Sequence, residues 1–118
     1  MVGFRVALSL TVFAAVLGAG SIARAAEPVR LTLKDHKFTP DKVTVPSGQR
    51  LKVEVTNQDE TPAEFESSAL RAEKIVVPGG KISIFVGPLK PGTYAFVDDY
   101  HPDAAKGSFI AVEKVAED

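Results

Sequence analysis

Residues 88–101 read Pro-Leu-Lys-Pro-Gly-Thr-Tyr-Ala-Phe-Val-Asp-Asp-Tyr-His, a turn followed by a strand-like run and an acidic segment. A turn rich in proline and glycine precedes Tyr94–Val97, whose aromatic and β-branched residues are typical of a strand. Acidic residues and a histidine follow where that strand ends. Binding groups are commonly found in loops that a rigid sheet supports. The stretch therefore predicts a strand that anchors in a core and brings Asp98, Asp99 and His101 to a loop.

Regular alternation of apolar and polar side chains recurs along the rest of the chain. In 29–34, 51–56 and 82–86 every second residue is Val, Leu or Ile, which places one face of each strand in a core. Short strands separated by turn residues predict an all-β fold, specifically an antiparallel Greek-key β-sandwich. Segment 67–74 is less regular and could hold a short helical turn. The phenylalanines expected to line the core or a site wall are Phe38, Phe65, Phe85, Phe96 and Phe109.

The first residues predict export. Arg5 gives a basic start, residues 6–20 form an uncharged apolar run, and residues 23–25 carry alanine at the positions that a signal peptidase reads. A retained membrane anchor is the alternative, but it needs about 20 consecutive apolar residues. We therefore expect a signal peptide over 1–25, one domain over 26–118, a periplasmic location, and no stable membrane span after signal removal.

Composition excludes several functional classes. Cysteine is absent from the 118 residues, so disulfides, thiolate catalysis and thiolate metal ligation are ruled out. Without the signal peptide, 12 basic residues stand against 15 acidic ones, which gives a charge near −3 and does not favour a nucleic-acid partner. Nothing in the sequence identifies a catalytic group or an electron acceptor, so no enzymatic activity is expected.

Acidic and imidazole groups concentrate at two places, each at the end of a strand-like run. Glu64 and Glu66 point to the same face of an extended chain, because side chains alternate with period two. Asp98 and His101 are separated by two residues, so a turn can bring a carboxylate oxygen and a ring nitrogen to one ion. Asp99 lies next to Asp98 in the second of these places.

The chain resembles the cupredoxins in its framework. The resemblance lies in the run from Phe38-Thr39-Pro40 to Gly48, in Val53 to Asn57, and in Pro88-Leu89-Lys90-Pro91-Gly92-Thr93-Tyr94. It implies that residues 26–118 form a cupredoxin-like domain. In blue-copper members of that family a histidine follows the strand that ends in asparagine, and a cysteine, a second histidine and usually a methionine come from one later loop.

Laid onto this chain, the resemblance puts the first histidine position at Glu64, the cysteine position at Asp98, the second histidine at His101, and the methionine near 105–106. Blue-copper electron transfer depends on the copper–thiolate bond, so that function does not carry over. The location of the site does carry over, and it implies a metal ion held by Glu64, Asp98 and His101 with Glu66 or Asp99 nearby. This implied set is rich in oxygen with one nitrogen, and it suits iron, manganese or copper(II).

The sequence Glu64-Phe65-Glu66 is similar to the Glu-aromatic-Glu element in the cupredoxin domain of EfeO-type periplasmic iron-uptake proteins. This resemblance implies a periplasmic accessory that binds an iron or copper ion for a membrane iron permease and works with other periplasmic uptake components. The alternative function is a metal-free β-sandwich interaction domain that docks on a membrane partner.

Each candidate ligand also has an ordinary structural explanation. Glu64 and Glu66 could be solvated strand carboxylates, as most surface glutamates are. Asp98 and Asp99 could cap their own turn, although adjacent like charges favour a bound cation, with Asp98 as ligand and Asp99 as an outer partner. His36 lies between Asp35 and Lys37 with a second lysine close by, and this positive charge disfavours a cation, so His36 is not expected to be a ligand.

Overall fold

The computed structural model describes residues 27–113, in which the chain forms nine strands and no helix. The predicted signal peptide over 1–25 lies outside the described residues. Within them, no helix is long and apolar enough to cross a membrane. The strands are β1 (Val29–Lys34), β2 (Lys37–Thr39), β3 (Lys42–Pro46), β4 (Leu51–Asn57), β5 (Ala63–Ser67), β6 (Ala72–Val76), β7 (Lys81–Val86), β8 (Gly92–Asp98) and β9 (Lys106–Val112).

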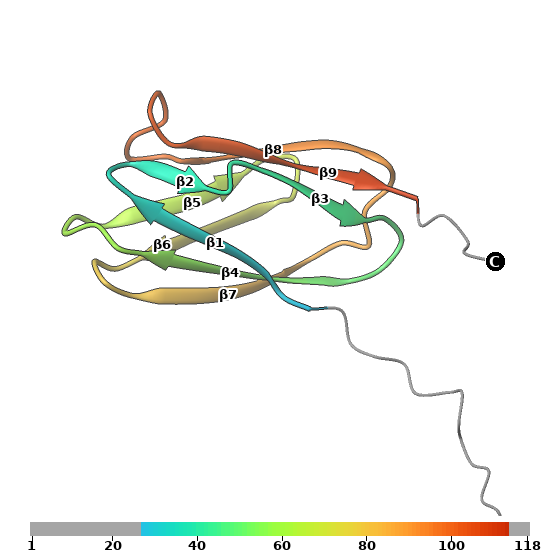
Figure 1. Ribbon diagram of the computed structural model, residues 1–118, viewed down its shortest axis with the longest axis horizontal. Helices are drawn as coiled ribbons and strands as arrows, with labels where there is room; N and C mark the ends of the chain where they lie inside the picture. Colours follow the sequence, from blue (N-terminus) through green and yellow to red (C-terminus); the bar gives the residue numbers. More distant parts are fainter. Residues whose placement is uncertain (1–26, 114–118) are drawn as a thin grey trace, which may run out of the picture.

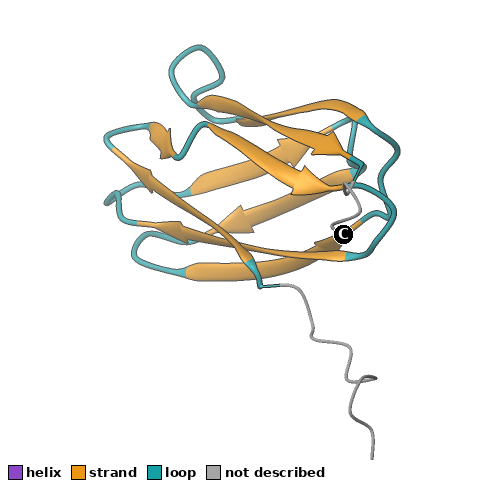
Figure 2. Ribbon diagram, turned by 45° about the vertical axis from the view of Figure 1, so that its right-hand side comes forward, coloured by secondary structure: helices purple, strands orange, loops and turns teal. Residues whose placement is uncertain are grey.

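Two sheets pack face to face, as Figures 1 and 2 show. One has the order β2-β1-β4-β7 and the other has the order β3-β9-β8-β5-β6. The predicted all-β sandwich is confirmed, but β1 pairs with β4 and β3 pairs with β9 in parallel, so both sheets are mixed and not purely antiparallel. Alternation of side chains could not reveal this, because parallel and antiparallel strands show the same period. The parallel β1 and β4 are joined through β2 and β3, which supply the crossover that such a pair needs.

Phenylalanines from both sheets form the centre of the core. The Phe96 ring lies 5.0 Å from Phe38, 5.3 Å from Phe65 and 5.0 Å from Phe109, centroid to centroid. Phe85 differs from the prediction, since it is 55% exposed and its ring lies 4.1 Å below the Arg50 guanidinium. The period of β7 explains this, because Ile82, Ile84 and Val86 face the core and Phe85 must then face outward.

Segment 67–74 contains a tight turn and an edge strand in place of the suggested helical turn. β5 and β6 form an antiparallel hairpin in which Ser67 pairs with Ala72. Arg71 has a φ of 57°, which lets the chain reverse over residues 68–71. β6 reads Ala-Glu-Lys-Ile-Val and is exposed along most of its length, so it lacks the clean alternation of an inner strand. Edge strands commonly carry such charged residues.

Three connections meet at one end of the sandwich, the left end in Figure 1. They are the β1–β2 turn, the β4–β5 loop and the β8–β9 loop. Asn57, fully buried at the end of β4, organises the second of these: its side-chain amide donates to the carbonyl oxygens of Thr61 (2.8 Å) and Val76 (3.0 Å). Its Oδ1 accepts a hydrogen bond from the Asp59 backbone N–H at 2.9 Å. This buried amide therefore positions the loop that follows it.

Candidate metal centre

Asp98 ends β8 with a carboxylate that is almost completely buried. Its side chain is 1% exposed and faces the core side of the sheet, because Asp98 pairs with the buried Phe65 across β5 and β8. Oδ1 accepts hydrogen bonds from the backbone N–H groups of Glu64 (2.9 Å) and Tyr100 (3.0 Å). These bonds connect β5 to the start of the β8–β9 loop, so the carboxylate has a structural task besides any ligand role.

His101 lies above Asp98 at the first turn of the β8–β9 loop. Its backbone N–H donates to the Asp98 carbonyl at 2.9 Å, and its own carbonyl accepts from the Ala105 N–H at 2.9 Å. The ring Nδ1 is 3.2 Å from Asp98 Oδ2, and the side chain is 35% exposed. The predicted proximity of Asp98 and His101 is present in the structure, and one side of the imidazole faces solvent.

His36 reaches the same place from the β1–β2 turn. Lys34 pairs with Lys37, so residues 35–36, the His36 turn, form a two-residue hairpin in which Asp35 and His36 have φ values of 52° and 57°. The His36 ring stacks on the His101 ring with centroids 3.9 Å apart and planes inclined by 25°. Its Nδ1 lies 3.5 Å from Asp59 Oδ2 in the β4–β5 loop.

Within the described residues, His36, Asp98 and His101 form the one group of at least three His, Asp or Glu residues whose ligand atoms all lie within 4.8 Å of one another.

Sequence reasoning set His36 aside because of its lysine neighbours. The negative charge of Asp59 offsets them: burial alone would raise the pKa of Asp59, but backbone hydrogen bonds from His36 and Asp35 and the nearby imidazoles lower it. The sequence signal that could have indicated a role for His36 is the two-residue turn between two strand-like runs, because such a turn places His36 at the ends of the strands.

The other predicted ligands lie elsewhere. Glu64 and Glu66 flank Phe65 in β5, so their side chains point to the outer face of the sheet while Asp98 points inward. Partial burial and the carboxylates of Glu73 and Asp99 raise the pKa of Glu64. The Asp99 carboxylate is the largest of the causes that raise the pKa of Glu66. The outer face of the sheet at β5 therefore carries closely spaced negative charges.

The structure thus separates the predicted set into an inner pair and an outer carboxylate group. The inner pair is Asp98 and His101, joined by His36; the outer group is Glu64, Glu66 and Asp99. The resemblance to the cupredoxin framework placed Glu64 at a ligand position shared with Asp98. The inward position at that end of β5 belongs instead to Ala63, which is 2% exposed and carries no ligand atom.

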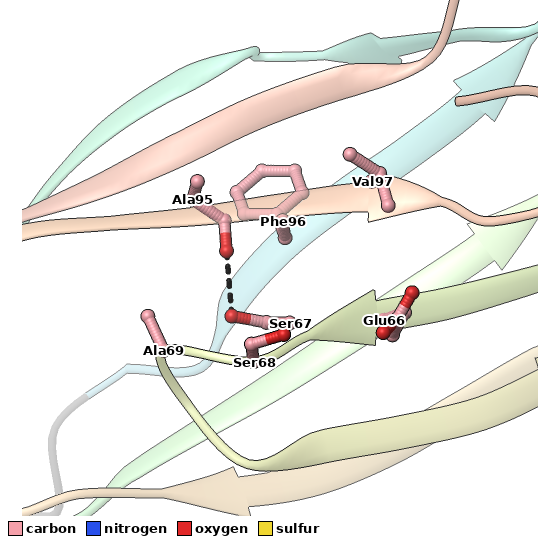
Figure 3. A pocket seen from close by; sticks show the side chains of 7 residues that line it. All are labelled: Glu66, Ser67, Ser68, Ala69, Ala95, Phe96 and Val97. Atoms are coloured by element: carbon pink, nitrogen blue, oxygen red, sulfur yellow. Dashed lines mark hydrogen bonds between the residues drawn. The ribbon is translucent and has the colours of Figure 1, made fainter. Parts of the chain in front are cut away.

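A hollow between β5 and β8 borders the outer carboxylate group through Glu66 and lies apart from the inner pair. It is lined by residues 66–69 and 95–97 and has a volume of about 310 Å³. Figure 3 shows the Ser67 hydroxyl directed at the Ala95 carbonyl, to which it donates a hydrogen bond of 2.6 Å. Glu66 is the single ionisable residue in the lining. The hollow therefore lacks the converging polar groups of a built site.

The donor set does not fit blue copper. The chain has no cysteine, and its single methionine is Met1, so the thiolate and thioether ligands are both missing. Two imidazoles and a carboxylate instead make a borderline set that suits Cu(II), Zn(II), Ni(II) or Fe(II). This set is less oxygen-rich than the one predicted from sequence, because His36 replaces the glutamates.

Solved structures support the fold. A mutant of amicyanin matches with a TM-score of 0.60 at 16% identity, covering 75% of this chain and 86% of that one. A purple cupredoxin from Nitrosopumilus maritimus matches with a TM-score of 0.55 at 14% identity, covering 71% and 99%. The metal-binding domain of a Cu(I)-exporting P-type ATPase from Streptococcus pneumoniae, solved with Cu(I), matches with a TM-score of 0.63 at 15% identity, covering 73% and 85%.

Comparisons of sequence agree with the fold. The uncharacterized protein RP394 of Rickettsia prowazekii (strain Madrid E) is 46% identical over 82 residues, which cover 70% of this chain and 66% of that relative's length. The model of the cupredoxin-like domain matches residues 6–111. With the two-sheet sandwich and the cupredoxin-like structural neighbours, this match establishes that the chain belongs to the cupredoxin-like domain family.

Proposed function

We propose that this chain is an exported metal-binding protein that holds a transition-metal ion, copper or iron, through His36, Asp98 and His101. The observation that carries the proposal is the convergence of these side chains from separate connections onto one end of the sandwich, with ligand atoms within 4.8 Å. Binding is the whole activity proposed, and no chemical step is assigned to the site.

The donor chemistry favours Cu(II) over iron in this proposal. Imidazole binds Cu(II) strongly, and Cu(II) stands highest in the affinity order of the divalent first-row ions. The chain has only two histidines, and both lie at this site. Any spectroscopic signal from metal-bound imidazole must therefore come from His36 or His101, which makes the proposal unusually easy to test.

The cellular role proposed is that of a periplasmic accessory to a membrane permease for iron, acting with other periplasmic uptake components. Its support is the Glu64-Phe65-Glu66 resemblance and the predicted signal peptide. The exposure of the imidazoles, 39% for His36 and 35% for His101, suits an ion that is captured and passed on. Deleting the gene in its source organism is expected to lower iron or copper accumulation under metal limitation, and unchanged accumulation of both would refute the role.

The binding proposal is tested by melting the purified protein with Cu(II), Fe(II) or Zn(II). At one hundred times the dissociation constant, a bound ion stabilises the folded state by about 2.7 kcal/mol. His101→Ala is expected to weaken Cu(II) binding at least tenfold. The matched control is Tyr100→Phe, an exposed neighbour in the same loop, which keeps wild-type affinity.

A separate variant tests the outer carboxylate group, because its members belonged to the predicted ligand set. A Glu64→Gln, Glu66→Gln, Asp99→Asn variant removes that group and leaves His36, Asp98 and His101 intact. If this variant loses binding and His101→Ala does not, the ion is held on the outer face and the proposed centre is wrong.

A metal-free interaction domain is the second candidate function. One observation favours it: both oxygens of Asp98 already have hydrogen-bond partners in the protein, at 2.9, 3.0 and 3.2 Å. It predicts that none of these ions changes the melting temperature of the wild-type chain. The same titration therefore decides between the two functions.

A further inference from the structure

The His36 turn has a backbone conformation that its residues adopt only at a cost. Both Asp35 and His36 have positive φ values, 52° and 57°, a region that residues with a Cβ seldom occupy and in which Asp and His are the more frequent exceptions. Two-residue hairpin turns of this kind usually contain Asn-Gly or Gly-Gly. Such strain persists when surrounding structure enforces it, and it is often found beside functional groups. Something outside the turn must therefore hold it.

Asp59 is the group that holds the turn. Its carboxylate accepts hydrogen bonds from the backbone N–H groups of both turn residues, Asp35 and His36, the latter at 3.0 Å. These donors are unpaired within a two-residue turn and point together at the β4–β5 loop. The Asp59 side chain is only 10% exposed, so water does not compete freely for it.

The same carboxylate also faces the His36 ring. Oδ2, which accepts the His36 backbone N–H, lies 3.5 Å from Nδ1 of that residue. Histidine ligands commonly direct one ring nitrogen at a carboxylate and bind metal with the other. Asp98 stands in a similar relation to His101, with Oδ2 at 3.2 Å from Nδ1. Asp98 differs from Asp59 in that it belongs to the proposed ligand group, whereas Asp59 lies outside it.

Asp59 is in turn held in place by Asn57. Its backbone N–H donates to Oδ1 of the fully buried Asn57, so the loop cannot move without breaking that bond. A continuous path of contacts then runs from Asn57 through Asp59 to His36, and by ring stacking to His101. A hollow of about 440 Å³, lined by residues 34–36 and 58–61, opens beside this path and gives solvent access to His36.

We propose that Asp59 is the positioning residue of the metal centre: it holds the His36 turn and the His36 ring so that Nε2 of His36 joins His101 at the ion. The inference rests on the proposed function and extends it to a residue outside the ligand group. Asp59 acts through His36 and does not itself contact the ion.

The test compares wild type with Asp59→Asn, and with Glu60→Gln as the matched control. Glu60→Gln removes one negative charge from the same loop, at an exposed side chain that lines the same hollow. An amide at position 59 has one acceptor oxygen in place of two, so it cannot serve both turn N–H groups and the ring. The probe is Cu(II) alone, followed by isothermal titration and by electron paramagnetic resonance of the bound ion.

Wild type and Glu60→Gln are expected to show coordination by two imidazoles. Asp59→Asn is expected to show one, matching His36→Gln, with Cu(II) affinity lowered tenfold or more. Two coordinated imidazoles at wild-type affinity in Asp59→Asn would overturn the inference while leaving the metal centre standing. If wild type itself binds no Cu(II), the centre and this inference fall together.

A measurement on the metal-free protein tests the positioning role of Asp59 without relying on Cu(II) affinity. Long-range proton–nitrogen spectra of the apo protein should show His36 as the tautomer with a proton on Nδ1, and Asp59→Asn should lose that preference while His101 keeps its own. An unchanged His36 tautomer would refute the positioning role. If Asp59→Asn alone fails to fold, the comparison is made within Asp35→Gly, because glycine tolerates the positive φ and keeps the turn formed.

Discussion

Replacing Asp98 separates the structural task of this carboxylate from any metal-binding task. In Asp98→Ala the backbone N–H groups of Glu64 and Tyr100 lose their acceptor, and both bonds lie at the junction of β5 with the β8–β9 loop. Each donor left unpaired in a partly buried position costs about 1–3 kcal/mol. We therefore expect Asp98→Ala to lower the free energy of unfolding by about 2–5 kcal/mol.

Asp98→Asn is the sharper comparison, because the side-chain volume and one acceptor oxygen are retained. The amide oxygen can still serve both backbone donors, and only the charged partner of His101 Nδ1 is lost. The His101 ring is 35% exposed, so water replaces much of that contact. A loss of about 1 kcal/mol is expected. Asp103→Asn, at an exposed position in the same loop and outside both groups, serves as the matched control.

The assay is urea unfolding at neutral pH in the presence of a chelator, which removes any contribution from bound metal. The expected order of stability is wild type, Asp98→Asn, Asp98→Ala. If Asp98→Ala unfolds within about 0.5 kcal/mol of wild type, the hydrogen bonds to Glu64 and Tyr100 do not hold the loop. The ordering of the β8–β9 loop by Asp98 would then be wrong, whatever the metal titrations show.

Other predictions follow from the core and the outer sheet face. In Gly107→Ala a Cβ would clash with the Asp41 carbonyl oxygen and lie 2.6 Å from the Phe96 ring, so urea unfolding should show a loss of about 1–3 kcal/mol, and wild-type stability would contradict this packing. Glu64 and Glu66 have pKa values raised above 4.5, so they stabilise the fold below that pH and cease to do so as pH rises through the raised values. Glu64→Gln and Glu66→Gln should therefore raise the urea midpoint at pH 7 and not at pH 4; equal effects at both pH values would refute the crowding of carboxylates.

The fold was predictable from local patterns, because burial of one face of a strand produces an alternation of apolar and polar residues in the sequence. The alternation in 29–34, 51–56 and 82–86 corresponds to β1, β4 and β7. The direction of a strand relative to its neighbour does not change this alternation, which is why the parallel pairs of β1 with β4 and β3 with β9 were not anticipated. β6 was also missed, since an edge strand need not alternate.

The candidate site was only partly predictable. Asp98 and His101 lie three positions apart, so local spacing was enough to bring them together. Glu64 was assigned from the family framework, and an offset of one residue in a strand reverses the face, which is why its side chain points away from Asp98. His36 is distant in sequence and enters through tertiary structure. Its lysine neighbours pointed against it, while the compensating charge of Asp59 lies 23 residues away.

A cupredoxin-like frame can evidently keep its loop architecture without a thiolate. Asp98 ties the β8–β9 loop to β5, and Asp59 ties the His36 turn to the β4–β5 loop, both through the protein's own hydrogen bonds. The backbone around both histidines is therefore ordered before any ion arrives, and less of the binding free energy is spent on arranging the loops. The two rings are stacked with planes inclined by only 25°, so they must rotate for both to bind one ion, and metal should enter with a change of ring orientation and little change of the backbone. A site with an ordered backbone, partly exposed imidazoles and no thiolate would suit the transfer role proposed above, and would not suit the long-lived copper–sulfur bond of an electron carrier.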